Sequence, residues 1–448
     1  MEGCCGTVWA LVNSFHNFSG FSSIGVAVPI TRWGMGIFQT SCQHSYRSVS
    51  SAMRRFVFVI LTLLLAANAR AVQLGIDRLQ ADGFQQLAGK RVGLVTNQTG
   101  VSSGGSKTRV ILKNAGKVKL VALFSPEHGI DGTVLAGRYV SSRRDAATGL
   151  PVHSLYGPTR KPTREMLAGL DALVFDMQDI GVRSYTYVSC MALCMEAAGE
   201  NGLEFIVLDR PNPLGGLRVE GPPIEARWKS YVGQFPVPYL HGMTTGELAR
   251  MANANGWTGA RCKLTVVPMT GWSRGMMWSD TGLRWVQTSP NIPRADSCAY
   301  YAATSIPGSL DGVGIEIGAG QPFPFEIVCS KWLDAGTFTA RMRSLGLPGV
   351  SFEPITFEGK QGSRIRLSPR SPVNFAALGV QILSEVNRPA LPSVFARYHD
   401  ADGIFWKIYG STSIRSQLAS TAPQRIAAGW ESGVARFKSA RQGYLLYQ

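Results

Sequence analysis

The stretch VKLVALFSPEHGIDG (Val118–Gly132) joins an apolar run directly to a carboxylate and an imidazole. The run VKLVALF predicts a buried strand, because Val, Leu, Ala and Phe dominate it. The Ser-Pro-Glu-His-Gly that follows predicts a tight turn. Glu127 and His128 therefore stand at the carboxyl end of a strand, the place where open parallel sheets bind their ligands.

Similar apolar runs lie on both sides of this stretch. They predict strands within Lys90–Asn97, Asp171–Gly181, Glu204–Gly216 and Cys262–Met269. Helical spacing separates them at Ser106–Gly116, Tyr185–Gly202 and Thr244–Gly256, where Thr245 is the N-cap candidate. Short apolar strands alternating with helices are typical of a parallel sheet covered on both faces. We therefore predict an α/β fold with a Rossmann-like catalytic domain over residues 72–270.

Beyond residue 270 the chain becomes richer in Pro, Gly and aromatic residues. Strands are predicted within 313–318, 325–329 and 350–359, and helices over 336–346, 373–387 and 423–441. This mixture predicts a smaller α+β C-terminal domain over residues 271–448, which would complete a cleft with the first domain.

The N-terminal region has the pattern of a secretory signal. Met53–Ala71 places two arginines before an apolar run and ends in Ala-x-Ala patterns. The run is short for a membrane span, although an uncleaved anchor or a core helix is the alternative. We expect translation to start at Met53, residues 53–71 to be a signal peptide, and residues 1–52 to be disordered and not part of the native protein. The protein would then be exported to the periplasm or the cell exterior.

Composition and charge indicate which classes of binding partner to expect. The chain has 448 residues, 45% of them apolar and 17% charged, which is enough for two or three globular domains. Residues 72–448 carry 40 Lys and Arg against 28 Asp and Glu, a formal net charge of +12. An exported basic protein favours anionic wall polymer or a membrane surface. Nucleic acid is not expected, because the basic residues are scattered. Stable membrane insertion after signal cleavage is not expected either.

The cysteines and histidines do not indicate a metal site. Residues 72–448 contain five cysteines, an odd number, so we expect buried thiols with at most one or two bridges. No CxxC pair, HExxH motif or close His spacing is present. We therefore expect neither a metal nor a cofactor.

Polar and titratable side chains follow every predicted strand. In chain order they are Asn97, Gln98 and Thr99, then Ser125, Glu127 and His128, then Asp176, Gln178, Asp179 and Arg183, and finally Asp209, Arg210 and Asn212. Unpaired charges are too costly for a core, so these groups line a cleft or pair with one another. A structural ion-pair network is the alternative for some of them, and Asp209 and Arg210 before PNP could instead anchor a rigid loop.

Six short motifs occur in a fixed order: GLVTNQTGV, LFSPEHGIDG, DIGVRSYTYV, LDRPNPLGG with VEGP, HGMTTGELA and SPNIP. Together they resemble the exo-β-N-acetylmuramidase family of glycoside hydrolases, and the likeness extends from Leu74 to the C-terminus. It implies an exported enzyme that removes terminal N-acetylmuramic acid from the non-reducing end of peptidoglycan fragments. It also implies an active site between a Rossmann-like and a smaller domain, with Glu127 as the leading catalytic candidate.

The chemistry of glycoside cleavage suggests roles for these residues. An acid must protonate the leaving oxygen, and a second group acts at the anomeric carbon. Glu127 suits the first role, and His128 could orient it. Asp176 and Asp179 are candidates for the second role, and the 2-acetamido group of the substrate is the alternative.

The remaining candidates concern substrate binding. Arg183 or Arg210 would hold the lactyl carboxylate through a bidentate contact. Tyr185, Tyr187 and Trp272 are candidates for stacking on a sugar ring. The other substrate-binding candidates are polar residues of the strand ends and motifs: Asn97, Ser125, Gln178, Asp209, Asn212, His241 and Asn291.

Two motifs resemble those of other protein classes, nucleotide-binding proteins and serine esterases. Gly100–Thr108 resembles a P-loop, but Ser106 intrudes between Gly105 and Lys107. GWSRG (Gly271–Gly275) fits the pattern of a serine esterase, with His399 as its late histidine, although no clear helix follows.

Two further alternatives concern the same cleft. A metal hydrolase would use His128, His241 and Asp179. A non-catalytic wall-binding module would need no poised acid, so an exposed Glu127 far from polar partners would favour the module.

Overall fold

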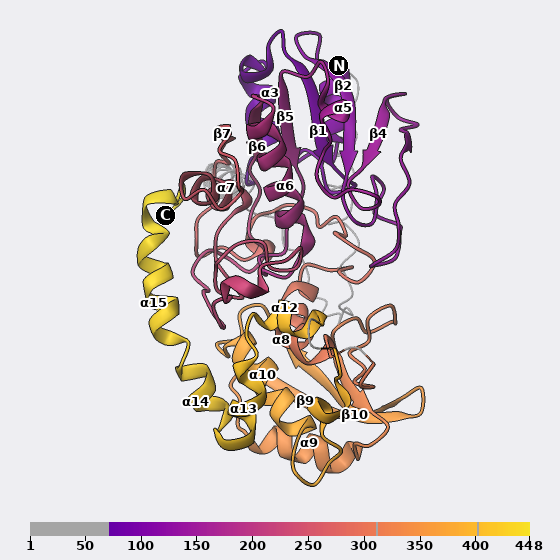
Figure 1. The fold of residues 1–448 in the computed structure, drawn as a ribbon, viewed down its shortest axis with the longest axis vertical. Coiled ribbons are helices and arrows are strands. Elements are labelled where there is room, and N and C mark those ends of the chain that lie inside the picture. The colour runs from indigo at the N-terminus through magenta and orange to yellow at the C-terminus, as the bar shows by residue number, and fades with distance from the viewer. Residues whose placement is uncertain (1–70, 311, 401–402) are drawn as a thin grey trace, which may run out of the picture. The chain divides into compact units, whose positions relative to one another are not determined.

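The computed structural model describes residues 71–310, 312–400 and 403–448. Within these residues a seven-stranded sheet has the order β3-β4-β2-β1-β5-β6-β7 (Figure 1). Neighbouring strands are parallel except for β3, which is antiparallel to β4. The strands are β1 (Arg91–Thr96), β2 (Lys119–Ser125), β3 (Arg143–Arg144), β4 (Pro151–Ser154), β5 (Ala172–Asp176), β6 (Glu204–Leu208) and β7 (Lys263–Val267).

Both faces of this sheet are buried. In β5, Ala172 and Val174 enter one apolar core, whereas Leu173 and Phe175 enter the other. The first core includes side chains of α3 (Gly75–Ala81) and α4 (Thr108–Asn114). The second includes side chains of α5 (Arg164–Leu167), α6 (Thr186–Glu200) and α7 (Thr245–Ala254). Two buried faces explain why the strands are nearly continuous apolar runs.

The order of the strands creates a switch point at β1. The chain goes from β1 to β2 on one side and later returns to place β5 on the other side. Loops that leave the carboxyl ends of β1 and β5 therefore diverge, which opens a crevice suited to ligands.

The C-terminal half contains a small antiparallel sheet of order β8-β10-β9. The β9–β10 hairpin turns at Glu358 and Gly359, which both have positive φ, as a two-residue type I′ loop requires. The elements of this half are α8 (Ser297–Gly308), β8 (Ile327–Ser330), α9 (Ala335–Ser344), β9 (Val350–Phe357), β10 (Lys360–Leu367), α10 (Phe375–Val386), α11 (Val394–Arg397), α12 (Ile404–Tyr409), α13 (Ser413–Ser420), α14 (Pro423–Ala428) and α15 (Glu431–Ala440).

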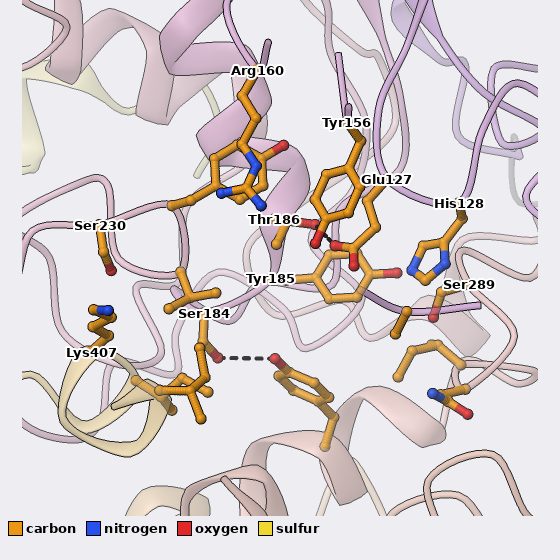
Figure 2. Close-up of a pocket in the computed structure, with 18 of the residues that line it drawn as sticks. Glu127, His128, Tyr156, Arg160, Ser184, Tyr185, Thr186, Ser230, Ser289 and Lys407 are labelled. Carbon is orange, nitrogen blue, oxygen red and sulfur yellow. Dashed lines mark hydrogen bonds between the residues drawn. The ribbon is translucent and has the colours of Figure 1, made fainter. Parts of the chain in front are cut away.

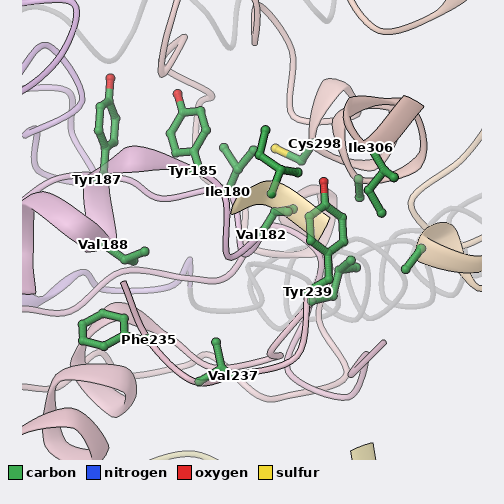
Figure 3. Packing of buried hydrophobic residues seen from close by; sticks show 14 of the residues in the cluster. Ile180, Val182, Tyr185, Tyr187, Val188, Phe235, Val237, Tyr239, Cys298 and Ile306 are labelled. Carbon is green, nitrogen blue, oxygen red and sulfur yellow. The ribbon is translucent and has the colours of Figure 1, made fainter. Parts of the chain in front are cut away.

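One apolar core continues from the large sheet into the C-terminal half (Figure 3). Val182 and Tyr239 belong to the same buried cluster as Cys298 and Ile306 of α8. The chain end also returns to the large sheet, where the Tyr447 hydroxyl donates to Asp209 Oδ2 at 2.6 Å. The two halves are therefore packed together through a shared interior.

The predicted α/β class with a smaller α+β second part is confirmed. Three local predictions were wrong. The helix near 244 is capped by Thr244, not Thr245, because the Thr244 hydroxyl accepts the Glu247 N–H in a capping box. The closing helix is divided between α14 and α15, and residues 313–318 form only an isolated bridge from Glu316 to Cys329.

Three further sequence predictions concern the N-terminal segment, membrane spans and the cysteines. The expected signal peptide and the segment 1–52 lie outside the described residues, apart from Ala71. Among the described helices, none is long and apolar enough to cross a membrane. The five described cysteines are free and buried.

Candidate active site

A cavity of about 450 Å³ opens where the loops after β2 and β4 face α8 and α12 (Figure 2). Its polar and aromatic lining comes from both halves of the described chain. These residues are Glu127, His128, Tyr156, Arg160, Ser184, Tyr185, Thr186, Ser230, Tyr231, Ser289, Asn291, Tyr301, Phe325 and Lys407.

The loop that carries Glu127 is tightly constrained. Strand β2 ends at Ser125, and the Gly129 N–H donates to the Pro126 carbonyl at 3.1 Å, which closes a turn around Glu127 and His128. His128 has a φ of 70°, a left-handed conformation that is uncommon outside glycine. Such backbone conformations are concentrated at functional sites.

The Glu127 carboxylate is held by donors on both oxygens. Gly137 N–H donates to Oε1 at 2.8 Å, and the Thr186 hydroxyl donates to Oε2 at 2.8 Å. Thr186 is the first residue of α6. Glu127 is only 7% exposed, although it lines the cavity. The carboxyl group is therefore fixed in orientation at the wall of a shielded pocket.

Two side chains flank this carboxylate (Figure 2). Burial and the neighbouring Glu127 charge raise the pKa of Tyr156 to about 12, so its phenol keeps its proton at neutral pH and can donate. On the other side, His128 Nδ1 lies 2.7 Å from the Val134 carbonyl oxygen, which fixes the imidazole ring. His128 Nε2 is then the nitrogen left for other partners.

Two cations also line the cavity. The Arg160 guanidinium lies between two rings, 4.8 Å from the centroid of Tyr156 and 4.5 Å from that of Tyr231. Lys407 comes from α12 in the C-terminal half. Neither forms an ion pair within the described residues, so both positive charges remain available to an anionic ligand.

The rest of the wall is pinned by hydrogen bonds across the two halves. The Tyr185 hydroxyl donates to Thr288 Oγ1 at 2.9 Å, and Ser184 Oγ lies 3.1 Å from the Tyr301 hydroxyl. Asn291 lines the cavity, and its Oδ1 accepts the Gly320 N–H at 2.7 Å. Of the residues predicted from sequence, the structure thus brings together Glu127, His128, Tyr185 and Asn291.

Asp176 does not reach this cavity. It is fully buried and pairs with Arg210, whose Nε lies 2.6 Å from Asp176 Oδ1. The Thr108 hydroxyl donates to its other oxygen at 2.5 Å. The geometry therefore supports the ion-pair alternative for Asp176, and it also removes Arg210 as a reader of the lactyl carboxylate in this cavity.

Asp179, Asn212 and His241 line a separate small space and not the first cavity. Its Oδ1 accepts the Gly181 N–H at 2.7 Å, but its Oδ2 is buried without a hydrogen-bond partner. Burial raises the pKa of Asp179 to about 7 and lowers the pKa of His241 to about 3. Asp179 is not among the residues that line the cavity, which argues against its expected role as the second catalytic group.

The guanidinium of Arg183 is also structural. It is 2% exposed and donates to the carbonyl oxygens of Pro222, Val237, Ile408 and Tyr409 at 2.7–3.1 Å. These contacts tie the loops of the first half to α12, and burial lowers the pKa of Arg183 to about 10. The expectation that Arg183 reads the lactyl group is therefore not supported by its position.

The other predicted binding residues serve the scaffold near the strand ends. Asp209 caps α7, since it accepts the Thr244 hydroxyl at 2.7 Å and the Gly246 N–H at 2.8 Å. Five others lie away from the first cavity because their side chains are buried under loops or in the core, or face other spaces: Asn97, Ser125, Gln178, Tyr187 and Trp272.

Sequence reasoning missed several lining residues. Tyr156 and Arg160 follow β4, the same position that revealed Glu127 after β2, but PVHS is too short and polar to predict a strand. Thr186 lies in the motif DIGVRSYTYV but was not singled out, and Tyr231 belongs to no motif. Lys407 approaches from a distant segment of the chain, which only the tertiary fold brings to the site.

The structure does not have the features that a serine esterase or a non-catalytic binding module would require. Ser273 of GWSRG is exposed in a loop, and no α-helix follows it before α8. A nucleophile elbow requires a strand and a helix around the serine. The discriminating observation for a binding module, an exposed and isolated Glu127, is likewise not met.

Comparison with known proteins identifies the family. The family description "Exo-beta-N-acetylmuramidase NamZ, N-terminal" matches residues 92–296, and the corresponding C-terminal description matches residues 299–447. The chain belongs to the NamZ family. Among its relatives is the peptidoglycan beta-N-acetylmuramidase NamZ of Bacillus subtilis strain 168, which is 39% identical over 88% of this chain and 100% of its own length.

Two solved structures share the NamZ fold. One DUF1343 family protein of Bacteroides fragilis has a TM-score of 0.78 and 40% identity, and covers 84% of this chain and 99% of its own. A second from the same organism has a TM-score of 0.63 and 27% identity, with the same coverage.

Proposed function

We propose that this protein is an exo-acting glycoside hydrolase that releases terminal N-acetylmuramic acid from the non-reducing end of peptidoglycan fragments. The observation that carries this proposal is the Glu127 carboxyl group, held by Thr186 and Gly137 at the wall of the cavity. Family membership supports the same activity, since the Bacillus subtilis relative is a peptidoglycan β-N-acetylmuramidase.

In this proposal, Glu127 transfers the proton at the glycosidic oxygen. General acid catalysis requires a carboxyl group whose position is fixed relative to the leaving oxygen. The donors on both oxygens and the turn at Pro126–Gly129 provide that fixation. His128 borders the same carboxyl and would bind a substrate hydroxyl through Nε2.

Arg160 and Lys407 replace Arg183 and Arg210 as the proposed readers of the lactyl carboxylate. Both line the cavity, and neither forms an ion pair within the described residues. Arginine binds carboxylates through two parallel N–H donors, whereas lysine acts as a point charge. The aromatic rings of Tyr156 and Tyr231 hold the Arg160 guanidinium in place.

The attacking group at the anomeric carbon is proposed to be the 2-acetamido group of the substrate. Among the described residues that line the cavity, Glu127 is the one carboxylate. Asp176 is paired with Arg210, and Asp179 lines a different space. Substrate-assisted catalysis is an established exception to the two-carboxylate scheme.

The activity is tested with a disaccharide of N-acetylmuramic acid and N-acetylglucosamine. The protein is expected to release both free sugars, and Glu127→Gln should lower turnover about 10²–10⁴-fold while substrate still binds. Glu431→Gln, an exposed position on α15, is the matched control and should retain full activity. Failure of the wild-type protein to cleave the disaccharide would overturn the proposal.

We further propose export by the signal sequence at residues 53–71, to the periplasm or the cell exterior. A basic, apolar and small-residue pattern supports it. N-terminal sequencing of the protein recovered outside the cytoplasm tests this proposal. A first residue near 70–72 is expected, and an exported chain that retains residues 1–52 would contradict it.

A further inference from the structure

A second cavity, of about 350 Å³, lies at the switch point of the large sheet. The loop after β1 lines it with residues 101–105, and Gln178 and Arg210 follow β5 and β6. Trp278 and residues 283–287 form its other side. Among the described residues, none lines both this cavity and the first one.

Buried polar atoms at this cavity lack partners within the described residues. The Arg210 side chain is held in place, because its Nε and Nη2 donate to Asp176 and Nη2 also donates to the Val101 carbonyl oxygen. Gln178 Oε1 and Trp278 Nε1 are buried without a partner. The orientation of the Gln178 amide is set by its Nε2, which donates to two carbonyl oxygens at 2.7 and 2.8 Å. Buried polar groups are rarely left unpaired, so these atoms point to a ligand.

Within the described part of the chain, one unpaired positive charge lines the cavity, since Arg210 is already paired with Asp176. Arg284 lines it, is exposed, and forms no ion pair within the described residues. No Asp or Glu is among the described residues that line it. Ser102 and Ser103 add hydroxyl groups, which can donate hydrogen bonds to an anion.

Aromatic surface completes the lining. Trp278 and Trp285 meet edge to face, with ring centroids 4.8 Å apart and an interplanar angle of 88°. An indole offers apolar area together with one N–H donor, which suits a ligand with both apolar and hydroxyl-bearing faces. The second cavity is therefore lined by arginines, by unpaired amide and indole atoms, and by aromatic rings.

We propose that this second cavity binds an anionic monosaccharide, with its carboxylate or phosphate against Arg210 and Arg284. A sugar hydroxyl would donate to Gln178 Oε1, and the ring would lie against Trp285. The loop Gly100–Thr108 takes part through its serines. Lys107, the residue that a nucleotide site of the P-loop kind would use, does not line the cavity.

The second cavity is joined to the first by one segment of the chain. Residues 283–287 line the second cavity, while Ser289, Asn291 and Ile292 line the first. Gln98 pins the segment between them by donating to the carbonyl oxygens of Gln287 and Thr288 at 2.8 and 2.9 Å. The inference does not rest on the proposed hydrolase activity, since it concerns binding at a separate space.

Isothermal titration calorimetry of the full chain tests the site. An Arg160→Met background weakens anion binding in the first cavity. N-acetylmuramic acid and N-acetylglucosamine 6-phosphate probe carboxylate and phosphate, and neutral N-acetylglucosamine is the control ligand. At least one anionic sugar should bind with a stoichiometry of one, and whichever binds more tightly identifies the anion. Neutral sugar should bind at least about tenfold more weakly.

Substitutions then locate the binding. Arg284→Ala should weaken it about tenfold or more, and Arg284→Glu should abolish it. Arg415→Ala, at an exposed arginine of α13, is the matched control and should change nothing. Arg284→Ala in the otherwise native chain should hydrolyse the disaccharide at the wild-type rate. Absence of binding, equal binding of the neutral sugar, or binding unaffected by Arg284→Glu would each overturn the proposal.

Discussion

The Thr186 hydroxyl donates to Glu127 Oε2 at 2.8 Å, although the two residues are 59 positions apart in sequence. The contact joins the loop after β2 to the first turn of α6. It makes the orientation of the Glu127 carboxyl depend on a helix that is itself buried against the sheet. The chemistry of Glu127 is therefore coupled to the packing of α6.

Removing this donor should impair turnover more than binding. A hydrogen bond to a charged group contributes about 1.5–3 kcal/mol, so Thr186→Val should lower kcat about 10–100-fold and leave KM nearly unchanged. Thr186→Ser keeps the hydroxyl and should restore most of the rate. Steady-state kinetics on the disaccharide measure both. Equal losses in the two variants would indicate a packing role for Thr186 rather than positioning of Glu127.

The loss of kcat caused by Glu127→Gln should depend on the leaving group of the substrate. A leaving group of low pKa needs little protonation, so an aryl glycoside of N-acetylmuramic acid should recover part of the rate lost on the natural disaccharide. The ratio of variant to wild-type kcat on the two substrates measures this recovery. The same fractional loss on both substrates would contradict a general-acid role at the leaving oxygen.

The same site shows why sequence reasoning places Glu127 at the cavity correctly but not Arg183. Both residues follow predicted strands, and both are polar in an apolar context. Glu127 faces the cavity because a turn with left-handed His128 directs it there. Arg183 turns inward because four carbonyl oxygens from loops and α12 surround its guanidinium. Strand ends can be located from apolar periodicity, but the direction of each side chain depends on segments hundreds of residues away.

Lys407 is a lining residue that local sequence patterns could not predict. The parallel sheet follows from local patterns, which the observed strand order bears out. The helix α12 has no chemical motif, and its contribution exists only because the shared core docks the C-terminal half against that edge.

Asp179 should make stability fall as pH rises. Burial raises its pKa in the folded protein to about 7 from an ordinary value near 3.8, so the folded state binds more protons between these values. Stability is then progressively lost as pH increases through that window. Asp179→Asn removes the titration, so its Tm should decline less than that of the wild type between pH 4 and about pH 7. Thermal unfolding scans across this range measure the difference, and parallel pH profiles would contradict it.

Arg160 and Lys407 should determine the preference for the lactyl carboxylate. Arg160→Met and Lys407→Met each remove a charge at similar length, so kcat/KM for N-acetylmuramic acid glycosides should fall about tenfold or more, while the slow cleavage of N-acetylglucosamine glycosides changes little. Arg183→Met is the comparison: it should lower Tm and preserve the ratio between the two sugars. Unchanged discrimination in both cavity variants would assign the carboxylate to another group.

The 2-acetamido group can be tested without altering the protein. If it attacks the anomeric carbon, the reaction passes through a bicyclic oxazolinium species, and a thiazoline analogue of N-acetylmuramic acid resembles that species in shape and charge. Transition-state and intermediate analogues bind about 10²-fold or more tightly than substrates. The thiazoline should therefore inhibit competitively with a Ki far below KM. Its affinity should fall in Arg160→Met, because the analogue retains the lactyl carboxylate. Inhibition no stronger than that of free N-acetylmuramic acid would exclude the acetamido group as the nucleophile and require a protein group in that role.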